Sequence, residues 1–95
     1  MSRRESVAVD LTPIQSKQAL HAALKDALDF PDWYGMNWDA FWDAITGVVD
    51  MPKRLKLSGW PGFQARLPRE AHQLKSALDE MSEKYPKSAA MVIYE

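Results

Sequence analysis

The 95-residue sequence contains no cysteine, which excludes both a disulfide framework and a thiolate metal site. No apolar stretch approaches the length that spans a bilayer, and the run from Met1 to Ser6 lacks the apolar region of a signal peptide. Only four glycines are present, and they are too scattered to form a phosphate-binding loop. These absences predict a single cytoplasmic domain, residues 1–95, that is monomeric when free.

The charge is nearly balanced overall but is unevenly distributed along the chain. A net charge of −1 is too small to indicate binding to nucleic acid or to a membrane. From Asp29 to Asp50, however, the sequence has five acids and no base. The remaining residues hold eight acids and twelve bases. An acidic middle segment without basic neighbours is therefore the feature that needs an explanation.

No combination of titratable residues points to an enzyme. The sequence has no Gly-x-Ser-x-Gly motif, and His21 and His72 fall on different predicted helices, where both are expected at the surface. Asp39 and Asp43 could act as acid and base or bind Mg²⁺, but two carboxylates make a weak metal site without further oxygen ligands. We therefore predict a protein without catalytic activity, metal or cofactor.

Apolar periodicity predicts strand, helix, helix, strand, helix and strand in that order. We expect strands at 6–11, 54–57 and 90–94, with a helix from the N-cap Ser16 to Leu28 and another from Pro68 to Tyr85. The apolar stripe of the second helix consists of Ala71, Leu74, Ala77, Leu78, Met81 and Tyr85. The basic residues Lys53, Arg54 and Lys56 favour an edge strand or a partly exposed one at 54–57. The continuous apolar run of 90–94 favours a strand covered on both faces, and 58–62 has the composition of a loop. Helical crossovers between strands favour a small parallel sheet.

Residues 30–47 read as a turn followed by a short helix. Asn37 is a good N-cap, and Gly47 is a good stop if it adopts the left-handed conformation. The predicted buried stripe consists of Trp38, Phe41, Trp42, Ile45, Val48 and Val49.

The neighbouring face of that helix carries Asp39, Asp43 and Thr46, which are spaced at i, i+4 and i+7. Asp39 lies in the first turn, where a carboxylate favours the positive end of the helix dipole. Asp43 lies one turn further along, where the helix dipole does not account for a carboxylate. Asp is a poor helix former at such a position, and Asp43 repels Asp39 by a few tenths of a kcal/mol. Asp43 is therefore the stronger candidate for a function.

Aromatic residues border this acidic row. Trp38 and Phe41 are expected in the core, and Trp60 is expected to fold back onto the domain. Trp33, Tyr34 and Trp42 lie beside the acids and the turn, where such side chains often act as interface anchors.

One run of residues closely resembles the signature of a known family. It reads Pro31-x-Trp33-Tyr34-Gly35-x-Asn37-x-Asp39-Ala40-x-Trp42-Asp43-x-x-Thr46-Gly47 and is similar to that of the barstar family, intracellular inhibitors of secreted guanyl-specific ribonucleases of the barnase type. The resemblance implies an α/β fold with a three-stranded parallel sheet packed with three to four helices. It also implies an immunity protein whose partner is such a ribonuclease.

The resemblance further implies roles for individual residues. Asp43 corresponds to the carboxylate that enters the phosphate pocket of the enzyme, and Trp33 replaces an aromatic residue that packs on a catalytic histidine. The last long helix is expected to add an acid, Glu80 or else Glu83, whereas Met36 stands where members often carry an acid. The implied partner-binding residues are Trp33, Tyr34, Gly35, Asn37, Asp39, Trp42, Asp43, Thr46, Gly47 and Glu80. The alternative is an interaction module of the same fold that binds a different toxin or a regulator.

Overall fold

Alternating apolar residues form three parallel strands in the computed structural model, which describes residues 3–95. They are β1 (Ser6–Asp10), β2 (Arg54–Ser58) and β3 (Met91–Tyr94), in the spatial order β1-β2-β3. The register places Val7, Leu55 and Val92 in one row across the sheet. The predicted parallel α/β fold is confirmed.

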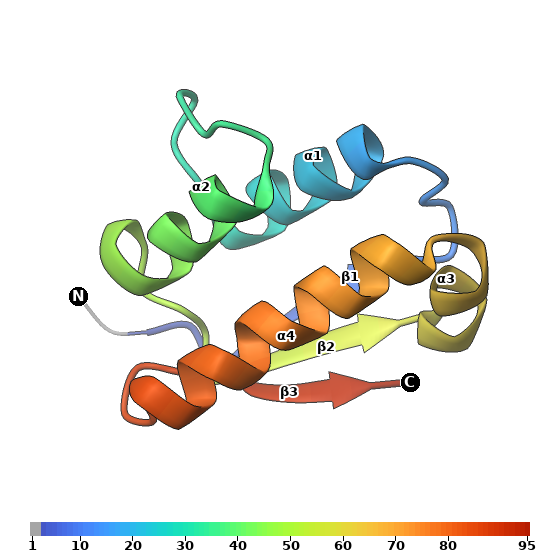
Figure 1. Ribbon diagram of the computed structural model, residues 1–95. Coiled ribbons are helices and arrows are strands. Elements are labelled where there is room, and N and C mark those ends of the chain that lie inside the picture. The colour runs from blue at the N-terminus through green and yellow to red at the C-terminus, as the bar shows by residue number, and fades with distance from the viewer. Residues whose placement is uncertain (1–2) are drawn as a thin grey trace.

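Helices connect the strands and gather on one side of the sheet (Figure 1). The first connection holds α1 (Lys17–Leu28), α2 (Trp38–Asp43) and a π-helical turn, η1 (Ala44–Val48), and the second holds α3 (Trp60–Arg66) and α4 (Pro68–Lys84). Because both crossovers step in the same direction along the sheet, right-handed connections place their helices on the same face. The other face of the sheet is left open.

This one-sided arrangement decides between the two interpretations of the strand beginning at Arg54 and corrects that of the last strand. The strand beginning at Arg54 is central and not an edge. It is partly exposed, because the side chains of Arg54 and Lys56 reach water through the open face. The last strand is an edge and is not covered on both faces, because Met91 is 60% exposed. A continuous apolar run was therefore a poor guide to burial here.

The core lies between the sheet and the helices. As predicted, Ser16 caps α1 by accepting a hydrogen bond from the backbone N–H of Ala19 at 3.0 Å. Trp60 is buried, as expected, whereas Tyr85 at the end of the predicted stripe of α4 is half exposed. The largest fully buried side chains are Phe41, Phe63, Leu11, Leu20, Leu24, Leu28, Ile45, Met51, Leu55, Leu57, Leu74 and Met81.

The expected loop at 58–62 is instead the start of α3. Gly59 precedes the helix with φ of 70°, and a Cβ built there would lie 2.5 Å from Oγ1 of Thr12. Only glycine fits both the left-handed backbone and that contact. Pro61 lies in the first turn, where its missing N–H is not needed. The same residues that suggested a loop are thus suited to starting a helix.

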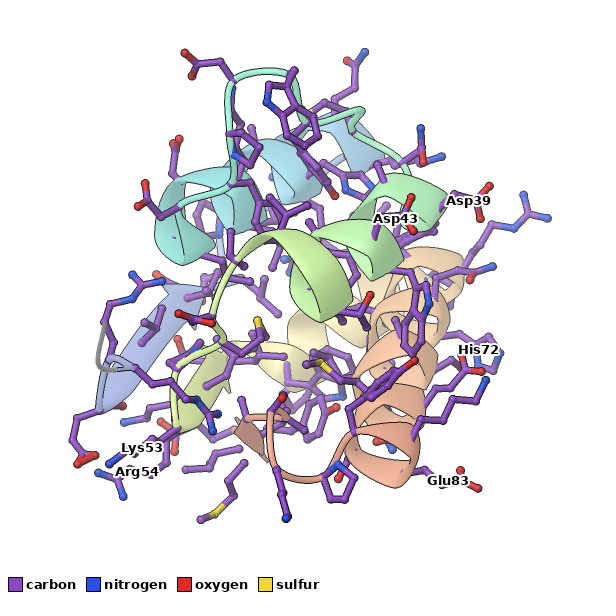
Figure 2. The ribbon with its side chains drawn as sticks, turned by 90° about the vertical axis from the view of Figure 1, so that its left-hand side faces the viewer. Asp39, Asp43, Lys53, Arg54, His72 and Glu83 are labelled. Atoms are coloured by element: carbon purple, nitrogen blue, oxygen red, sulfur yellow. The ribbon has the colours of Figure 1, made fainter. Side chains whose placement is uncertain are left out.

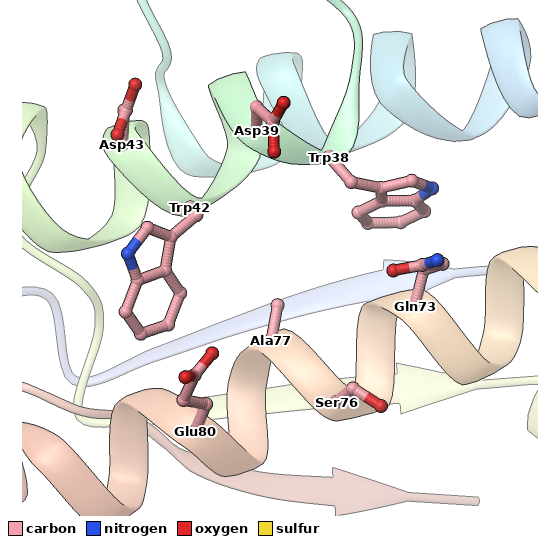
Figure 3. Close-up of a pocket in the computed structure, with 8 residues that line it drawn as sticks. All are labelled: Trp38, Asp39, Trp42, Asp43, Gln73, Ser76, Ala77 and Glu80. Atoms are coloured by element: carbon pink, nitrogen blue, oxygen red, sulfur yellow. The ribbon is translucent and has the colours of Figure 1, made fainter.

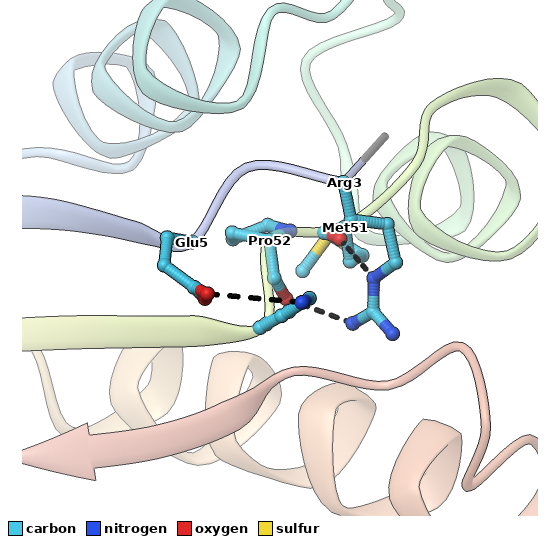
Figure 4. Close-up of polar contacts among 5 residues, drawn as sticks. Arg3, Glu5, Met51 and Pro52 are labelled. Atoms are coloured by element: carbon cyan, nitrogen blue, oxygen red, sulfur yellow. Dashed lines mark hydrogen bonds and ion pairs between the residues drawn. The ribbon is translucent and has the colours of Figure 1, made fainter. Parts of the chain in front are cut away.

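Arg3 ties the beginning of the chain to the sheet. Its Nε donates a hydrogen bond to the carbonyl of Met51 at 2.7 Å, and Nη2 donates to the carbonyl of Pro52 at 2.9 Å (Figure 4). Further bonds reach the carbonyls of Lys87 and Ala89, both at 3.0 Å. One side chain thereby joins the segments that lead into β2 and β3.

No helix in residues 3–95 has the length and apolar content needed to cross a membrane.

Candidate functional site

The loop between α1 and α2 exposes one aromatic side chain and buries the next. The backbone N–H of Tyr34 donates to the carbonyl of Pro31 at 2.9 Å, which closes a turn with Trp33 at its tip. Trp33 is 74% exposed, whereas Tyr34 is only 6% exposed. An exposed indole of this size offers a large area for burial in a partner. Of the two, Trp33 is positioned to act as an anchor, and Tyr34 packs inside.

Asn37 and Gly35 shape the entry to α2. Oδ1 of Asn37 accepts a hydrogen bond from the backbone N–H of Ala40 at 2.7 Å, and Nδ2 donates to the carbonyl of Gly35 at 3.2 Å. The predicted N-cap is therefore confirmed. A Cβ at Gly35 would lie 3.2 Å from the Cβ of Ala40, so glycine allows the loop to approach the helix closely.

Asp39 and Asp43 project outward from α2. Both are exposed, and Figure 2 shows their carboxylates on the outer side of the helix. Within residues 3–95, neither carboxylate has a Lys, Arg or His nitrogen within 4.0 Å. Mutual repulsion at i, i+4 is therefore not relieved by the protein's own bases. This leaves two carboxylates available to an external cation.

The helix does not stop at a left-handed Gly47, so that prediction is wrong. The chain continues through the π-helical turn η1, and the backbone turns extended only at Val49. The wider turn also places Val48 at the surface with 45% exposure, not in the expected buried stripe. Thr46 donates its hydroxyl to the carbonyl of Trp42 at 2.6 Å and lines a hollow with Arg3 and Lys87, away from the acidic pair.

A groove of about 450 Å³ lies between α2 and α4 (Figure 3). The structure brings Glu80 to this groove together with Asp39 and Asp43, while Glu83 is not among its lining residues. Glu80 also pairs with Lys84 at 2.9 Å, and Lys84 lies 5.9 Å from the ring centre of Trp42. The lining residues are Trp38, Asp39, Trp42, Asp43, Gln73, Ser76, Ala77 and Glu80.

A second hollow of about 250 Å³ lies on the other side of the acidic pair. Its walls are mostly apolar, and Trp33 and Val48 form part of them. Asp43 lines both this hollow and the groove, so it stands on the ridge between them. The lining residues are Pro31, Trp33, Tyr34, Gly35, Ala40, Asp43, Ala44 and Val48. Gln73, Ser76 and Val48 were not expected here, since no sequence pattern links them to the acids.

His21 is fully buried, which corrects the prediction of a surface histidine. Its Nδ1 lies 2.7 Å from Oη of Tyr34, and its ring centre lies 4.5 Å from that of Trp38. Burial and, to a smaller extent, Lys17 lower the pKa of His21 to about 4, and Glu70 opposes the shift. Burial also raises the pKa of Tyr34 well above its usual range. His72 is exposed on α4, as predicted.

Within the described residues, no three His, Asp or Glu side chains converge as metal ligands. The arrangement instead offers two carboxylates between two hollows, with an exposed indole nearby. Such a surface suits a cationic protein partner better than a small ligand.

The chain is similar to known proteins over almost its whole length. Residues 4–94 match the family model described as Barstar (barnase inhibitor). The chain is also 34% identical over 87 residues to a protein of Bacillus subtilis (strain 168) named "Putative ribonuclease inhibitor YrdF". That match covers 92% of this chain and 96% of the relative.

Proposed function

This chain belongs to the barstar family, and from that premise we propose that it blocks the active site of a barnase-type, guanyl-specific ribonuclease. Proteins of this family are inhibitors and not enzymes. The observation that carries the proposal is the pair Asp39 and Asp43, which is exposed and has no basic partner within residues 3–95.

The physical basis is mimicry of phosphate. A ribonuclease must concentrate positive charge where the transition-state phosphate lies. Carboxylates placed in the same position neutralise those cations and exclude RNA. The negative field of the 29–50 segment, with five acids and no base, would also accelerate encounter with a cationic enzyme.

The two hollows would receive side chains of the enzyme on either side of Asp43. The groove has a carboxylate at Asp39 and an aromatic wall at Trp42, which suits a long basic side chain with an apolar stem. Glu80 pairs with Lys84 at 2.9 Å, and it would contribute once a cation of the enzyme replaces Lys84 in that exposed pair. On the other side, Trp33 would pack against a histidine of the enzyme, as the family signature implies. Val48 would widen that apolar contact, since it lines the same hollow.

We further propose that the protein acts in the cytoplasm as an immunity protein. A cell that makes a secreted ribonuclease needs protection from any copy that folds before export. The inhibitor would be a monomer when free, with its acidic surface open to the enzyme.

Titration of ribonuclease activity tests the proposal. The target enzymes are barnase and a barnase-type ribonuclease encoded in the same genome as this chain. We expect RNA cleavage to fall to zero near one equivalent of inhibitor. Unchanged cleavage of both enzymes at tenfold excess would contradict the proposal, and would favour the alternative in which the same fold binds a different toxin or a regulator.

A charge-matched pair of variants locates the binding surface. Asp43→Asn removes one charge from the ridge, and we expect at least a 100-fold weaker inhibition, about 3 kcal/mol. That scale is the one measured for close charge pairs in the barnase–barstar complex. Asp26→Asn removes the same charge from an exposed position on α1 and should change inhibition by less than about threefold. Equal losses in both variants would show that net charge, not the ridge, determines binding.

A further inference from the structure

We propose that His21 is a positioning residue for the binding surface, because it connects α1 through Tyr34 to the residue that begins α2. The inference rests on the proposed function and extends it to a buried side chain that no partner could touch. Its consequence is that the exposed Trp33 and Asp39 depend on an imidazole in the interior.

A chain of polar contacts carries this connection. Nδ1 of His21 lies 2.7 Å from Oη of Tyr34, and both side chains are buried. The same hydroxyl lies 3.5 Å from the carbonyl oxygen of Asn37. That carbonyl also accepts the backbone N–H of Phe41 at 2.9 Å, the first hydrogen bond of α2. The contacts thus run from α1 through the loop to the first turn of the acidic helix.

The number of satisfied hydrogen bonds identifies the tautomer of His21. With the proton on Nδ1, the imidazole donates to Tyr34, whose hydroxyl is then able to donate to the carbonyl of Asn37. With the proton on Nε2, Tyr34 must donate to His21 and the contact to Asn37 is lost. Nε2 has no hydrogen-bond partner within residues 3–95 in either tautomer, so the two tautomers differ in the bond from Tyr34 to Asn37, which only the first arrangement allows. The first arrangement is therefore favoured.

The surroundings of His21 keep the imidazole neutral. Tyr34 and Trp38 pack against its ring, with centre-to-centre distances of 5.8 and 4.5 Å. The charged groups that act on it are Lys17 on its own helix and Glu70 on α4. Burial and Lys17 hold the pKa of His21 at about 4, against the smaller opposing effect of Glu70. At neutral pH the imidazole is therefore uncharged and carries a single N–H, which the relay places on Nδ1.

A double-mutant cycle against barnase tests the relay. His21→Leu and Tyr34→Phe each break it, and we expect each to weaken inhibition by about tenfold. The double variant should be no weaker than either single one, because both remove the same connection. His21→Asn places an amide N–H near the position of Nδ1 and should restore inhibition to within about threefold. Inhibition by folded His21→Leu at the wild-type level would overturn the proposal.

NMR of the free wild-type protein supplies a readout that does not require the partner. ¹⁵N shifts of the imidazole should show the proton on Nδ1 at pH 7, and the Nε2–H tautomer would overturn the relay. In His21→Leu, the Trp33 indole and Ala40 amide signals should shift, and they should return toward wild-type positions in His21→Asn. Unshifted signals would also count against the proposal.

These measurements separate the two proposals. If wild type fails to inhibit, the proposed function fails while the tautomer and loop signals still decide the positioning role. If Asp43→Asn loses inhibition and His21→Leu does not, the inhibitor function stands and the positioning role of His21 is wrong.

Discussion

The acidic pair on α2 and the open face of the sheet carry charges of opposite sign and differ in how those charges are neutralised. On the sheet side, Lys56 pairs with Glu95 at 3.2 Å and Lys53 pairs with Glu5 at 3.7 Å. In the described residues, Asp39 and Asp43 have no such pair. Figure 2 shows Lys53 and Arg54 at the opposite end of the view from the two aspartates.

This difference indicates that the paired charges contribute to stability, whereas the acidic pair on α2 is available for binding. A charge paired within the protein is screened and offers little to a partner. Two like charges left together on a short helix lower the stability of that helix by a few tenths of a kcal/mol, and they gain a role only when an external cation approaches. The basic side of the molecule should therefore affect stability, and the acidic side should affect inhibition.

The largest expected effect on stability is at Arg3. Arg3→Met keeps the apolar stem and removes the hydrogen bonds to four backbone carbonyls. We expect urea denaturation to show a loss of about 2–3 kcal/mol in the free energy of unfolding, with inhibition unchanged where the variant is folded. Arg54→Met, at an exposed arginine, is the control and should stay within about 0.5 kcal/mol. Equal stability of the two variants would contradict the role of Arg3.

Trp33→Ala tests the aromatic part of the proposed binding surface. We expect inhibition to weaken about 30-fold, or about 2 kcal/mol, because an interface anchor is lost. The free energy of unfolding should change by less than about 0.5 kcal/mol, since the indole is exposed. Met91→Ala removes another exposed apolar side chain, this one from the sheet, and should leave inhibition unchanged. A large loss of stability in Trp33→Ala would mean that the indole supports the fold.

Acid should weaken the fold through His21. The ordinary pKa of 6.5 applies in the unfolded chain and about 4 in the folded one, so below pH 6.5 the unfolded state takes up a proton that the folded state excludes. Between pH 6.5 and pH 5 we expect urea denaturation to show a loss of about 1–2 kcal/mol from this group. His72→Leu should keep this pH dependence, and His21→Leu should lack it. The same slope in both would show that another group is responsible.

The smallest expected changes in the free energy of unfolding have opposite signs at Asp43 on α2 and at Lys56 on the sheet. Asp43→Asn should raise the free energy of unfolding by a few tenths of a kcal/mol by relieving repulsion with Asp39. Lys56→Gln should lower it by a few tenths by removing an exposed ion pair. Both changes are measurable by replicate urea denaturation of the purified variants. Destabilisation by Asp43→Asn would show that the carboxylate has a favourable partner in the protein.

Local signals in the sequence predicted most of the elements. The N-caps Ser16 and Asn37 and the apolar stripe of α4 depend on neighbours within one or two turns, and they were found where expected. The family signature was readable for a similar reason, since its residues lie within one loop and one helix. The position of Glu80 could not be derived from such local signals, because its approach to the acidic pair depends on the packing of α4 beside α2.

The wrong predictions share a dependence on contacts distant in sequence. His21 shares a helix face with Lys17 and Lys25, and it is covered by Tyr34 of the loop and Trp38 of α2, which lie 13 and 17 residues further along the chain. The start of α3 was read as a loop because Gly59 and Pro61 favour both turns and helix starts. No residue pattern in the sequence predicted the π-helical turn, which places Val48 at the surface and not in the buried stripe.

Gly47 lies in that turn, is exposed, and would give an added Cβ no neighbour within 4 Å. An alanine at this position would therefore meet no other part of the described chain, and a longer side chain would begin in open space. A series from alanine to leucine at residue 47 would act as a molecular ruler, in which the first substituent to disturb a complex measures how closely the other molecule approaches the backbone.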